Sequence, residues 1–383
     1  MATGAGEQFW EQQRLPSVLK HDLLRRYLPV FAGKTGSRAV GVVYLDGYAG
    51  RGRYEDGSPA SPELILQIAL DKRSARINYR LFFYERDTES FAVLKNVVDE
   101  YVERGVQAEA ANCEVISGLG QVIVAAAGLP LFLFLDPCGL GIPFSVLVKI
   151  LTGPRAATWP PTEVLLNFSL DAVRRIAGLV TSATPNEKTM ARLDDALSGD
   201  WWRDLVRHGV TDQAVGAIVS GFMERLARAT NMQIFAIPVR RSPSQRPIYF
   251  LVFGTRSNLG IWHFADSAAR ATETWWDTLI AREVAKLKAI GQDSLFGDEP
   301  AVSRLEQVES KALPVIVENI ARLTTQHGRI RVGDYPGEIF GEYLGQVREK
   351  VVRAAIKDLH RDGRTPSEGK GRQTADLVVS SPR

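Results

Sequence analysis

Cysteine is scarce in this sequence, since only two occur among 383 residues. Two cysteines cannot form a disulfide framework or a four-cysteine zinc site. The histidines at positions 21, 208, 327 and 360 show no metal-ligand spacing. We therefore expect no metal site.

Long apolar runs and a strong charge imbalance are also missing. No segment approaches the roughly 18 uninterrupted apolar residues of a membrane span, and the first twenty residues lack the apolar core of a signal peptide. The net charge is +3, from 47 basic and 44 acidic residues, which is too small to indicate nucleic-acid binding by itself. We expect a soluble, cytoplasmic protein that does not bind membranes and whose basic surface, if any, is local.

Apolar segments alternate with helical patterns along most of the chain. Continuous apolar runs predict strands at 40–46, 79–84, 131–136 and 163–168. Helical patterns lie at 8–31, 61–74, 88–104, 186–230 and 257–290, and short apolar segments lie at 115–127 and 143–152. This alternation predicts a doubly wound, Rossmann-like α/β sheet with helices on both faces. The later runs 233–240 and 248–254 flank a hairpin loop, so we expect an antiparallel pair at the far edge.

Four segments follow from this pattern. We predict a helical segment at 1–34, a Rossmann-like domain at 35–290, a linker at 291–303 and a small C-terminal domain at 304–383. The last segment is expected to hold a helix at 305–325, a helix at 343–361, a polar loop and a short strand. That order is typical of a winged helix-turn-helix.

A glycine-rich loop, YLDGYAGRGRYEDGSPASP at 44–62, follows the first strand. A phosphate-binding P-loop requires GxxxxGK followed by Ser or Thr, and here RYE follows the last glycine. A dinucleotide fingerprint is GxGxxG, whereas this order is GxxGxG with Asp46 directly ahead of it. A carboxylate there would repel pyrophosphate and suits a cationic group instead. A glycine turn without any ligand remains an alternative.

S-adenosylmethionine offers such a cation in its α-amino group, which Asp46 can bind by charge-assisted hydrogen bonds. Gly47, Gly50 and Gly52 would bring bare backbone close to the methionine part. Glu85 ends the second strand, where an acid binds ribose hydroxyls in nucleoside-binding sheets. Asn112 is a candidate for the adenine edge, although a plain loop asparagine explains it equally well.

The fourth strand ends in FLFLDPCGLGIPF, which places Asp136 ahead of a proline. Acids therefore end three successive strands, at Asp46, Glu85 and Asp136. Because ligands bind at the carboxyl edge of doubly wound sheets, this pattern predicts a cofactor cleft.

With these residues, the chain resembles the three-Cys-motif partner protein family, whose members are class I methyltransferase-like proteins. The matching segments are LKHDLLRRYLPVF, YLDGYAGRGRYEDGSPASP, YERD, FLDPCGLGIPF and IYFLVFGTRSNLGIW, together with the C-terminal unit. The resemblance covers nearly the whole chain. It implies a methyltransferase-like fold and a protein partner that carries a three-cysteine motif of radical-SAM type.

The loop also looks like the DxFAGxG loop of DNA methyltransferases, with Tyr48 in place of Phe. The fourth strand ends where amino-methyltransferases carry Asp-Pro-Pro-aromatic, whose Asp binds the target amine and whose ring stacks on an extruded base. This likeness implies a catalytic segment made of Asp136, Pro137, Cys138 and Gly139. The last two depart from the motif, so Phe144 or Tyr48 would have to supply the ring.

The Pro-Cys pair also allows a cytosine-5 methyltransferase interpretation, in which Cys138 attacks the ring. That chemistry needs an acid on the next strand, which instead ends near Asn167. We therefore expect Cys138 to be a small buried or cleft-lining residue.

Basic residues recur at three- and four-residue steps near the C-terminus. They are Arg353, Lys357, Arg361 and Arg364, and they predict a nucleic-acid-binding face on a recognition helix. A solvated helix face beside a protein-binding module is the alternative.

Together these features predict an S-adenosylmethionine-dependent methyltransferase that acts on an amino group of a base in RNA or DNA, with the three-Cys-motif partner. A non-catalytic module that delivers nucleic acid to that partner is the first alternative. A nucleotide-dependent enzyme is the second, and the glycine order and Asp46 count against it.

Overall fold

The computed structural model describes residue 10 and residues 13–72, 77–289 and 303–382. The chain forms two compact units. Unit 1 comprises Met1–Ser17 and Leu28–Arg256, and unit 2 comprises Val18–Tyr27 and Ser257–Arg383. These limits differ from the expected boundaries at 34 and 290, and residues 291–302 of the expected linker lie outside the described residues.

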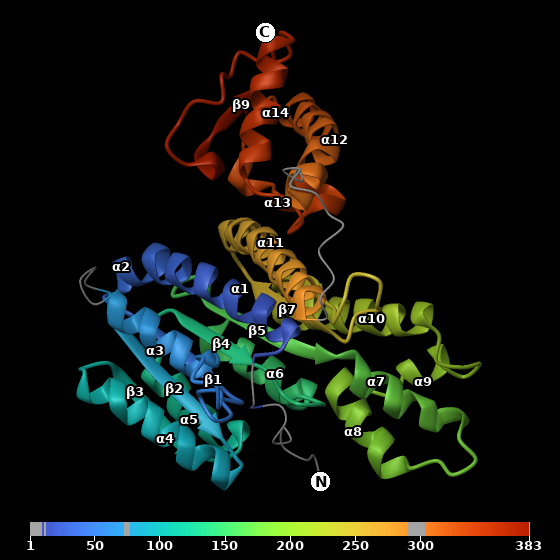
Figure 1. Ribbon diagram of the computed structural model, residues 1–383. Coiled ribbons are helices and arrows are strands. Elements are labelled where there is room, and N and C mark those ends of the chain that lie inside the picture. The colour runs from blue at the N-terminus through green and yellow to red at the C-terminus, as the bar shows by residue number, and fades with distance from the viewer. Residues whose placement is uncertain (1–9, 11–12, 73–76, 290–302, 383) are drawn as a thin grey trace. The chain divides into compact units, whose positions relative to one another are not determined.

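Unit 1 is built on a seven-stranded sheet in the order β3-β2-β1-β4-β5-β7-β6 (Figure 1). The strands are β1 Val42–Asp46, β2 Tyr79–Glu85, β3 Gln107–Asn112, β4 Leu131–Leu135, β5 Thr162–Ser169, β6 Gln233–Val239 and β7 Tyr249–Thr255. The first five run parallel, and β7 pairs antiparallel with both β5 and β6. The predicted doubly wound sheet with an antiparallel edge hairpin is confirmed.

Helices cover both faces of this sheet. They are α1 Leu15–Phe31, α2 Ser37–Ala39, α3 Ser61–Asp71, α4 Thr88–Glu103, α5 Val115–Ala125, α6 Phe144–Leu151, α7 Leu170–Ala177, α8 Glu187–Leu197, α9 Trp202–Leu205 and α10 Asp212–Thr230. A short π-helical turn, Ala32–Gly36, joins α1 to α2.

The central strands are buried on both faces because their side chains alternate between two apolar layers. Val43 and Leu45 of β1 belong to the core that also contains residues of α5, α6, α8 and α10. Tyr44, between them, points to the opposite face, where its ring stacks on Phe132 at 6.0 Å. Continuous apolar runs therefore predicted these strands correctly.

Strand β3 was not predicted as a strand. Its sequence, QAEAAN, has no apolar run, and its residues are exposed or half-buried along its whole length. The reason is its position at the sheet edge, where one side of the ladder has no neighbouring strand.

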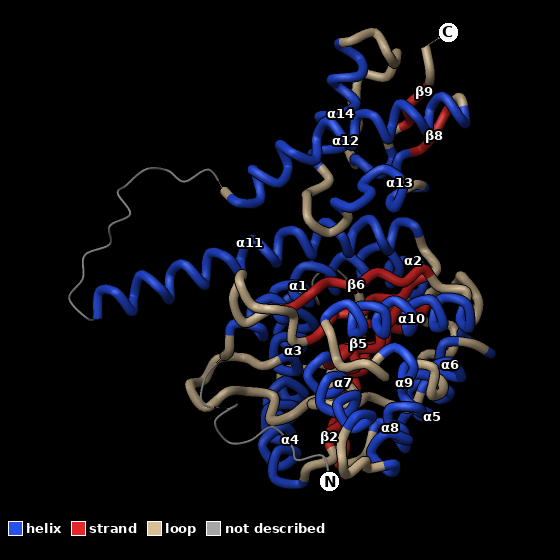
Figure 2. The backbone as a smooth tube through the Cα atoms, turned by 90° about the vertical axis from the view of Figure 1, so that its right-hand side faces the viewer, coloured by secondary structure: helices blue, strands red, loops and turns tan. Residues whose placement is uncertain are grey.

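Unit 2 contains α11 Asn258–Ala289, α12 Arg304–His327, β8 Arg329–Arg331, α13 Pro336–Phe340, α14 Lys350–Arg361 and β9 Val378–Ser380. Strands β8 and β9 pair antiparallel, and the tube view separates these helices and strands by colour (Figure 2). Trp262 of α11 is fully buried in the core of this unit and meets Phe340 at 5.1 Å. This packing explains why α11 groups with the C-terminal elements.

The helix expected at 343–361 is shorter than predicted and begins at Lys350. The preceding residues form a 3-10 turn, Gly341–Tyr343, and Gly345 has a φ of 75°, which an α-helix does not accept. Among the helices of the described residues, none has the length and apolarity that crossing a membrane would require.

Candidate cofactor cleft and acceptor site

Four of the predicted site residues lie at one edge of the unit 1 sheet. Asp46, Glu85 and Asn112 end β1, β2 and β3, and Asp136 directly follows β4. Because these strands are parallel and adjacent, their carboxyl ends share an edge. Glu85 and Asn112 are also register partners across β2 and β3.

Asp46 is fully buried. One carboxylate oxygen accepts a hydrogen bond from the Tyr48 backbone N–H at 3.1 Å. The other accepts one from the Ser61 hydroxyl at 2.9 Å. Asp46 therefore ties the start of the glycine loop to the first residue of α3. Sequence reasoning missed Ser61, whose only signal is its place in the SPASP string at the helix start.

The glycines of the loop are explained by backbone conformation and by protein packing. Gly50 and Gly52 have φ values of 63° and 80°, a region that favours glycine. A Cβ at Gly50 would lie 2.3 Å from the ring of Trp10, and one at Gly47 would lie 2.7 Å from Val115. The directions in which side chains would project are therefore already occupied by the protein.

Glu85 links two turns at the cleft edge. One of its oxygens accepts a hydrogen bond from the Gly50 N–H at 2.8 Å, and the other accepts one from the Asp87 N–H at 2.8 Å. The carboxylate is half-buried, and each oxygen has a second lone pair that can accept a hydroxyl. Glu85 therefore holds the glycine loop against β2 and retains acceptor capacity.

Asn112 holds the turn after β2. Its amide nitrogen donates to the carbonyls of Glu85 at 2.9 Å and Arg86 at 3.0 Å. Its amide oxygen accepts a hydrogen bond from the Thr88 hydroxyl at 3.3 Å. Both amide hydrogens of Asn112 are therefore donated to backbone carbonyls.

Asp136 is paired with Asn167 of β5. The Asn167 amide nitrogen donates to a carboxylate oxygen of Asp136 at 2.6 Å. The amide oxygen of Asn167 is buried and has no hydrogen-bond partner among the described residues. Such an acceptor is uncommon in a folded protein and calls for an explanation. The sequence placed Asn167 near the end of β5 but assigned it no role.

The remainder of the predicted catalytic segment differs from expectation at one position. Pro137 is buried and Gly139 has a φ of 151°. Cys138 is exposed, so the expectation that its side chain is buried is wrong. The proline and the glycine bracket it in a turn that directs its side chain outward.

The two proposed substitutes for the missing stacking ring differ in burial, since Phe144 is buried and Tyr48 is half-buried. Phe144 is buried and meets Phe222 edge to face at 6.0 Å. Tyr48 packs against the core of unit 1, and burial raises the pKa of its hydroxyl well above its usual value. Base stacking by Phe144 would need a rearrangement of this core.

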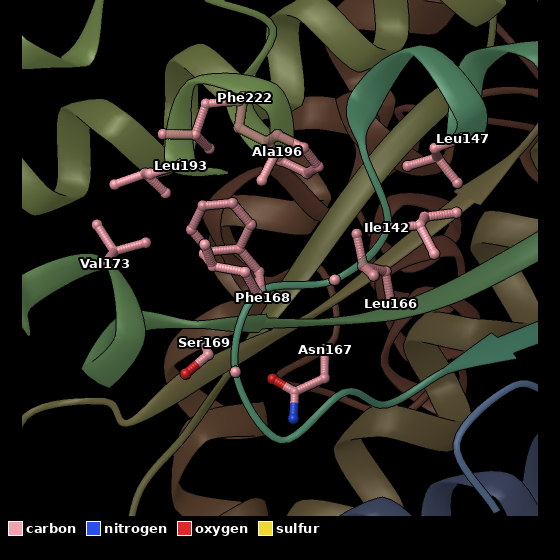
Figure 3. A pocket seen from close by; sticks show the side chains of 14 residues that line it. Ile142, Leu147, Leu166, Asn167, Phe168, Ser169, Val173, Leu193, Ala196 and Phe222 are labelled. Carbon is pink, nitrogen blue, oxygen red and sulfur yellow. The ribbon is translucent and has the colours of Figure 1, made fainter. Parts of the chain in front are cut away.

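A pocket adjoins the Asp136–Asn167 pair (Figure 3). Its walls come from the loop after β4, the end of β5 and helices α6, α7, α8 and α10. Its apolar side chains include Ile142, Leu147, Phe168, Val173, Leu193, Leu197 and Phe222, and its polar side chains are those of Asn167 and Ser169. No charged residue is among the described residues that line it.

Three of the four predicted nucleic-acid-binding residues make contacts within unit 2. Arg353 donates to the Gly369 carbonyl at 2.7 Å. Arg361 forms an ion pair with Asp358 at 2.9 Å. Arg364 donates two hydrogen bonds to the Glu318 carboxylate, at 2.6 and 2.9 Å. Lys357 is exposed. Carboxylates therefore neutralise two of the four basic residues, Arg361 and Arg364.

Within the part of the chain that the structure describes, no group of three or more His, Cys, Asp or Glu residues is arranged to hold a metal ion.

No protein-family model and no curated protein sequence matches the chain. Among solved structures, it resembles the small RNA methyltransferase HEN1, with a TM-score of 0.33 and 8% identity over 62% of this chain and 25% of that one. It also resembles the methyltransferase domain of bacterial CtHen1-CN, with a TM-score of 0.31 and 8% identity, covering 61% of this chain and 98% of that one.

A third similar structure is magnesium protoporphyrin IX methyltransferase (ChlM) from Synechocystis PCC 6803 with bound SAH, with a TM-score of 0.28 and 11% identity. That match covers 62% of this chain and 85% of the other. The chain spans only a quarter of the HEN1 structure.

Proposed function

We propose that unit 1 binds S-adenosylmethionine and transfers its methyl group to an amino nitrogen held beside Asp136. The observation that carries this proposal is the row of polar side chains at the carboxyl ends of four adjacent parallel strands, Asp46, Glu85, Asn112 and Asp136. Ligands of doubly wound sheets bind at this edge.

The residues at this sheet edge fit the cofactor, although Asp46 has a different role from the one expected. Glu85 is half-buried and keeps lone pairs for two ribose hydroxyls. Asp46 is buried with both oxygens engaged, so it acts as a positioning residue that fixes the loop. The loop backbone around Gly50 and Gly52 would then bind the methionine part. Asn112 would shape the adenine end by holding the turn after Glu85.

The cofactor supplies an activated methyl group on a sulfonium, so the protein mainly has to position the acceptor. Asp136 would hold the acceptor nitrogen beside that methyl group, accept the proton that the nitrogen loses on transfer and pass it to water. The hydrogen bond from Asn167 orients the Asp136 carboxylate for this role.

A nucleic-acid base is the acceptor that we propose, with unit 2 as the binding module. Its order of helix, strand, short helix, longer helix and strand supports the proposal that it is a winged helix-turn-helix. Exposed Lys357 would contact phosphate, and Arg353, Arg361 and Arg364 would do so only by exchanging their present contacts. The three-Cys-motif protein is the partner that the family resemblance suggests.

The alternative is a module without catalysis that delivers nucleic acid to that partner. The observation that favours it is the segment after Asp136, where Cys138 and Gly139 supply no stacking ring and Phe144 is buried in the core.

Calorimetric titration of the full chain with S-adenosylmethionine and S-adenosylhomocysteine tests the cofactor. We expect Glu85→Gln to weaken binding about tenfold or more, since it loses a charged acceptor. Glu89→Gln, an exposed acid in the first turn of α4, serves as the matched control. No binding by the wild-type chain would refute the cofactor proposal.

Tritiated-methyl transfer to total RNA and total DNA, with and without the partner, tests catalysis. Asp136→Asn should bind the cofactor normally and transfer no label. Cofactor binding without labelling under every condition would favour the non-catalytic module.

A further inference from the structure

The loop that joins β6 to β7, residues 240–248, lies at the carboxyl edge of the unit 1 sheet. Tyr249, the first residue of β7, is the register partner of Val239 at the end of β6 and of Ser169 at the end of β5. Because β4 and β5 run parallel, this edge is also the one that carries Asp136. Strand β7 is the second neighbour of β4, so the loop begins roughly 10 Å along the sheet from the end of β4.

The base of this loop is fixed to the start of α7. The Ile248 carbonyl accepts hydrogen bonds from the Leu170 N–H at 2.9 Å and from the Asp171 N–H at 3.3 Å. The guanidinium of Arg174 donates to the Pro247 carbonyl at 3.0 Å. The side chains of the loop are therefore held at a defined place beside the candidate cleft.

Arginines are the only charged residues of the loop, whose sequence is RRSPSQRPI. Arg241 is 64% exposed and lies 3.5 Å from Asp171. Arg246 is 63% exposed and lies 3.9 Å from Asp212. Both carboxylates are shared with Arg174, at 3.9 and 3.2 Å. Two carboxylates thus face three guanidinium groups, which leaves positive charge uncompensated at this edge.

The excess charge and the side chains of the loop fit a chain of phosphate groups. Arg240 adds a fourth guanidinium and no further acid, and a guanidinium binds two phosphate oxygens at once. The exposed side chains of Ser244 and Gln245 are types that contact phosphate in nucleic-acid complexes. Within the described loop no large hydrophobic side chain is exposed, so the loop offers a membrane surface nothing to insert.

We propose that the β6–β7 loop binds the sugar–phosphate backbone of single-stranded nucleic acid beside the candidate cleft. This inference rests on the proposed methyl transfer to a base, and it adds a phosphate-binding surface on unit 1 to the one proposed for α14. A base that is modified at the sheet edge must be unpaired. Its strand then needs a nearby cationic surface, and the arginines of this loop supply one.

Fluorescence anisotropy of labelled oligouridylate and oligothymidylate with the full chain, without cofactor, tests this surface and separates RNA from DNA. Neither base has an exocyclic amino group, so binding reports on the backbone and not on acceptor chemistry. The triple variant Arg240→Gln, Arg241→Gln, Arg246→Gln should bind about tenfold or more weakly. The slope of log affinity against log salt should fall by about 2, since each lost phosphate contact removes about 0.7.

A matched control removes three exposed arginines from the opposite edge of the same sheet. They are Arg80 near the start of β2, Arg104 directly after α4 and Arg228 near the end of α10. The control triple variant has the same net charge as the loop variant and should keep the wild-type affinity and slope. Arg246→Glu, compared with Arg228→Glu, repeats the test with one exposed side chain if a triple variant has a lowered thermal midpoint.

Two results would overturn the proposal. One is an equal loss of affinity in the loop variants and their controls, which would assign binding to overall charge. The other is wild-type binding by the loop variants, which would leave phosphate contacts to unit 2. Loop-dependent binding of polyglutamate or of phosphatidylserine vesicles, without binding of either oligonucleotide, would overturn the choice of nucleic acid.

These outcomes are separable from failure of the cofactor proposal. If S-adenosylmethionine does not bind but oligonucleotide binding depends on the loop arginines, the methyl-transfer function fails and the backbone-binding surface stands. If the cofactor binds and the loop variants bind both oligonucleotides as the wild type does, the surface fails alone.

Discussion

The ring of Trp10 lies directly over the α-carbon of Gly50, so that a Cβ built there would come within 2.3 Å of Cη2. Trp10 is buried, and its carbonyl accepts a hydrogen bond from the Glu55 N–H at 2.8 Å. The glycine loop is therefore covered by a residue forty positions earlier in the chain. Gly50→Ala should destabilise unit 1 by about 2 to 4 kcal/mol, from backbone strain and overpacking together.

Gly57 of the same loop is the matched control for that substitution. Its φ is 81°, but nothing lies within 4 Å of a Cβ there. Gly57→Ala should therefore cost only the backbone strain, about 1 kcal/mol. In a Trp10→Ala background the cost of Gly50→Ala should fall to the same value, measured by urea denaturation followed by circular dichroism. An unchanged cost would mean that Trp10 does not set the requirement for glycine.

Replacing each of two glycines of α5 by alanine should change the stability of the protein in opposite directions. A Cβ at Gly118 would lie 2.2 Å from the ring of Tyr84, whose hydroxyl donates to the Gly118 carbonyl at 3.1 Å. Gly118→Ala should destabilise by about 1 to 3 kcal/mol. Gly120 is exposed with nothing within 4 Å, so Gly120→Ala should stabilise by about 0.5 to 1 kcal/mol through helix propensity. Thermal unfolding of the two variants measures both changes. A change of stability in the same direction for both would contradict the packing described for Gly118.

Arg155 is a buried cation that joins the chain before β4 to the start of β5. Its guanidinium donates to the carbonyls of Ala126, Leu129 and Pro161 and to the Thr162 hydroxyl, and burial lowers its pKa. Lysine cannot reproduce this planar set of donors. Arg155→Lys should cost about 3 to 5 kcal/mol in denaturant unfolding, while the exposed control Arg175→Lys should change stability by less than about 0.5 kcal/mol.

Glu309 makes the stability of unit 2 depend on pH. Burial by itself would raise the pKa of this carboxyl, but hydrogen bonds from Arg348 and Lys350 outweigh it and hold the pKa below 4.5. A carboxyl with a lowered folded-state pKa stabilises above its unfolded pKa and loses that contribution as the pH falls through the folded value. The free energy of unfolding should therefore fall below about pH 4.5.

Glu309→Gln tests this by removing the titrating group. The variant should be less stable at neutral pH and should lose less stability between pH 5 and 3 than the wild type, by an amount on the order of 1 kcal/mol. Glu342→Gln, at an exposed position, should keep the wild-type pH profile. A wild-type profile in Glu309→Gln would assign the acid sensitivity to other groups.

Most of the sheet was predictable from sequence because burial on both faces leaves a continuous apolar run. Strands β1, β2, β4 and β5 carry such runs, and the hairpin loop marked β6 and β7. Strand β3 lacks the run because only one of its sides has a partner strand. A strand with mostly polar, half-exposed residues has no periodic signal that separates it from a loop.

The candidate site was predictable in position but not in detail. The acids at the strand ends reach the same edge because topology demands it. The contacts that define their roles, Asp136 with Asn167 and Gly50 with Trp10, join residues 31 and 40 positions apart. Such contacts depend on how strands pair and loops pack, and neither leaves a trace in local residue spacing.

Helix α1 contributes its middle, Val18–Tyr27, to unit 2, while its ends belong to unit 1. Tyr27 donates to the Gly260 carbonyl and its ring meets Phe264 at 5.2 Å, so its partners lie 233 residues or more later in the chain. At ribosomal speed the helix is made roughly ten seconds to a minute before them. The first helix to emerge is thus among the last to be completed, and a gene cut after Arg256 leaves all of unit 1 in one fragment but divides unit 2 between the two.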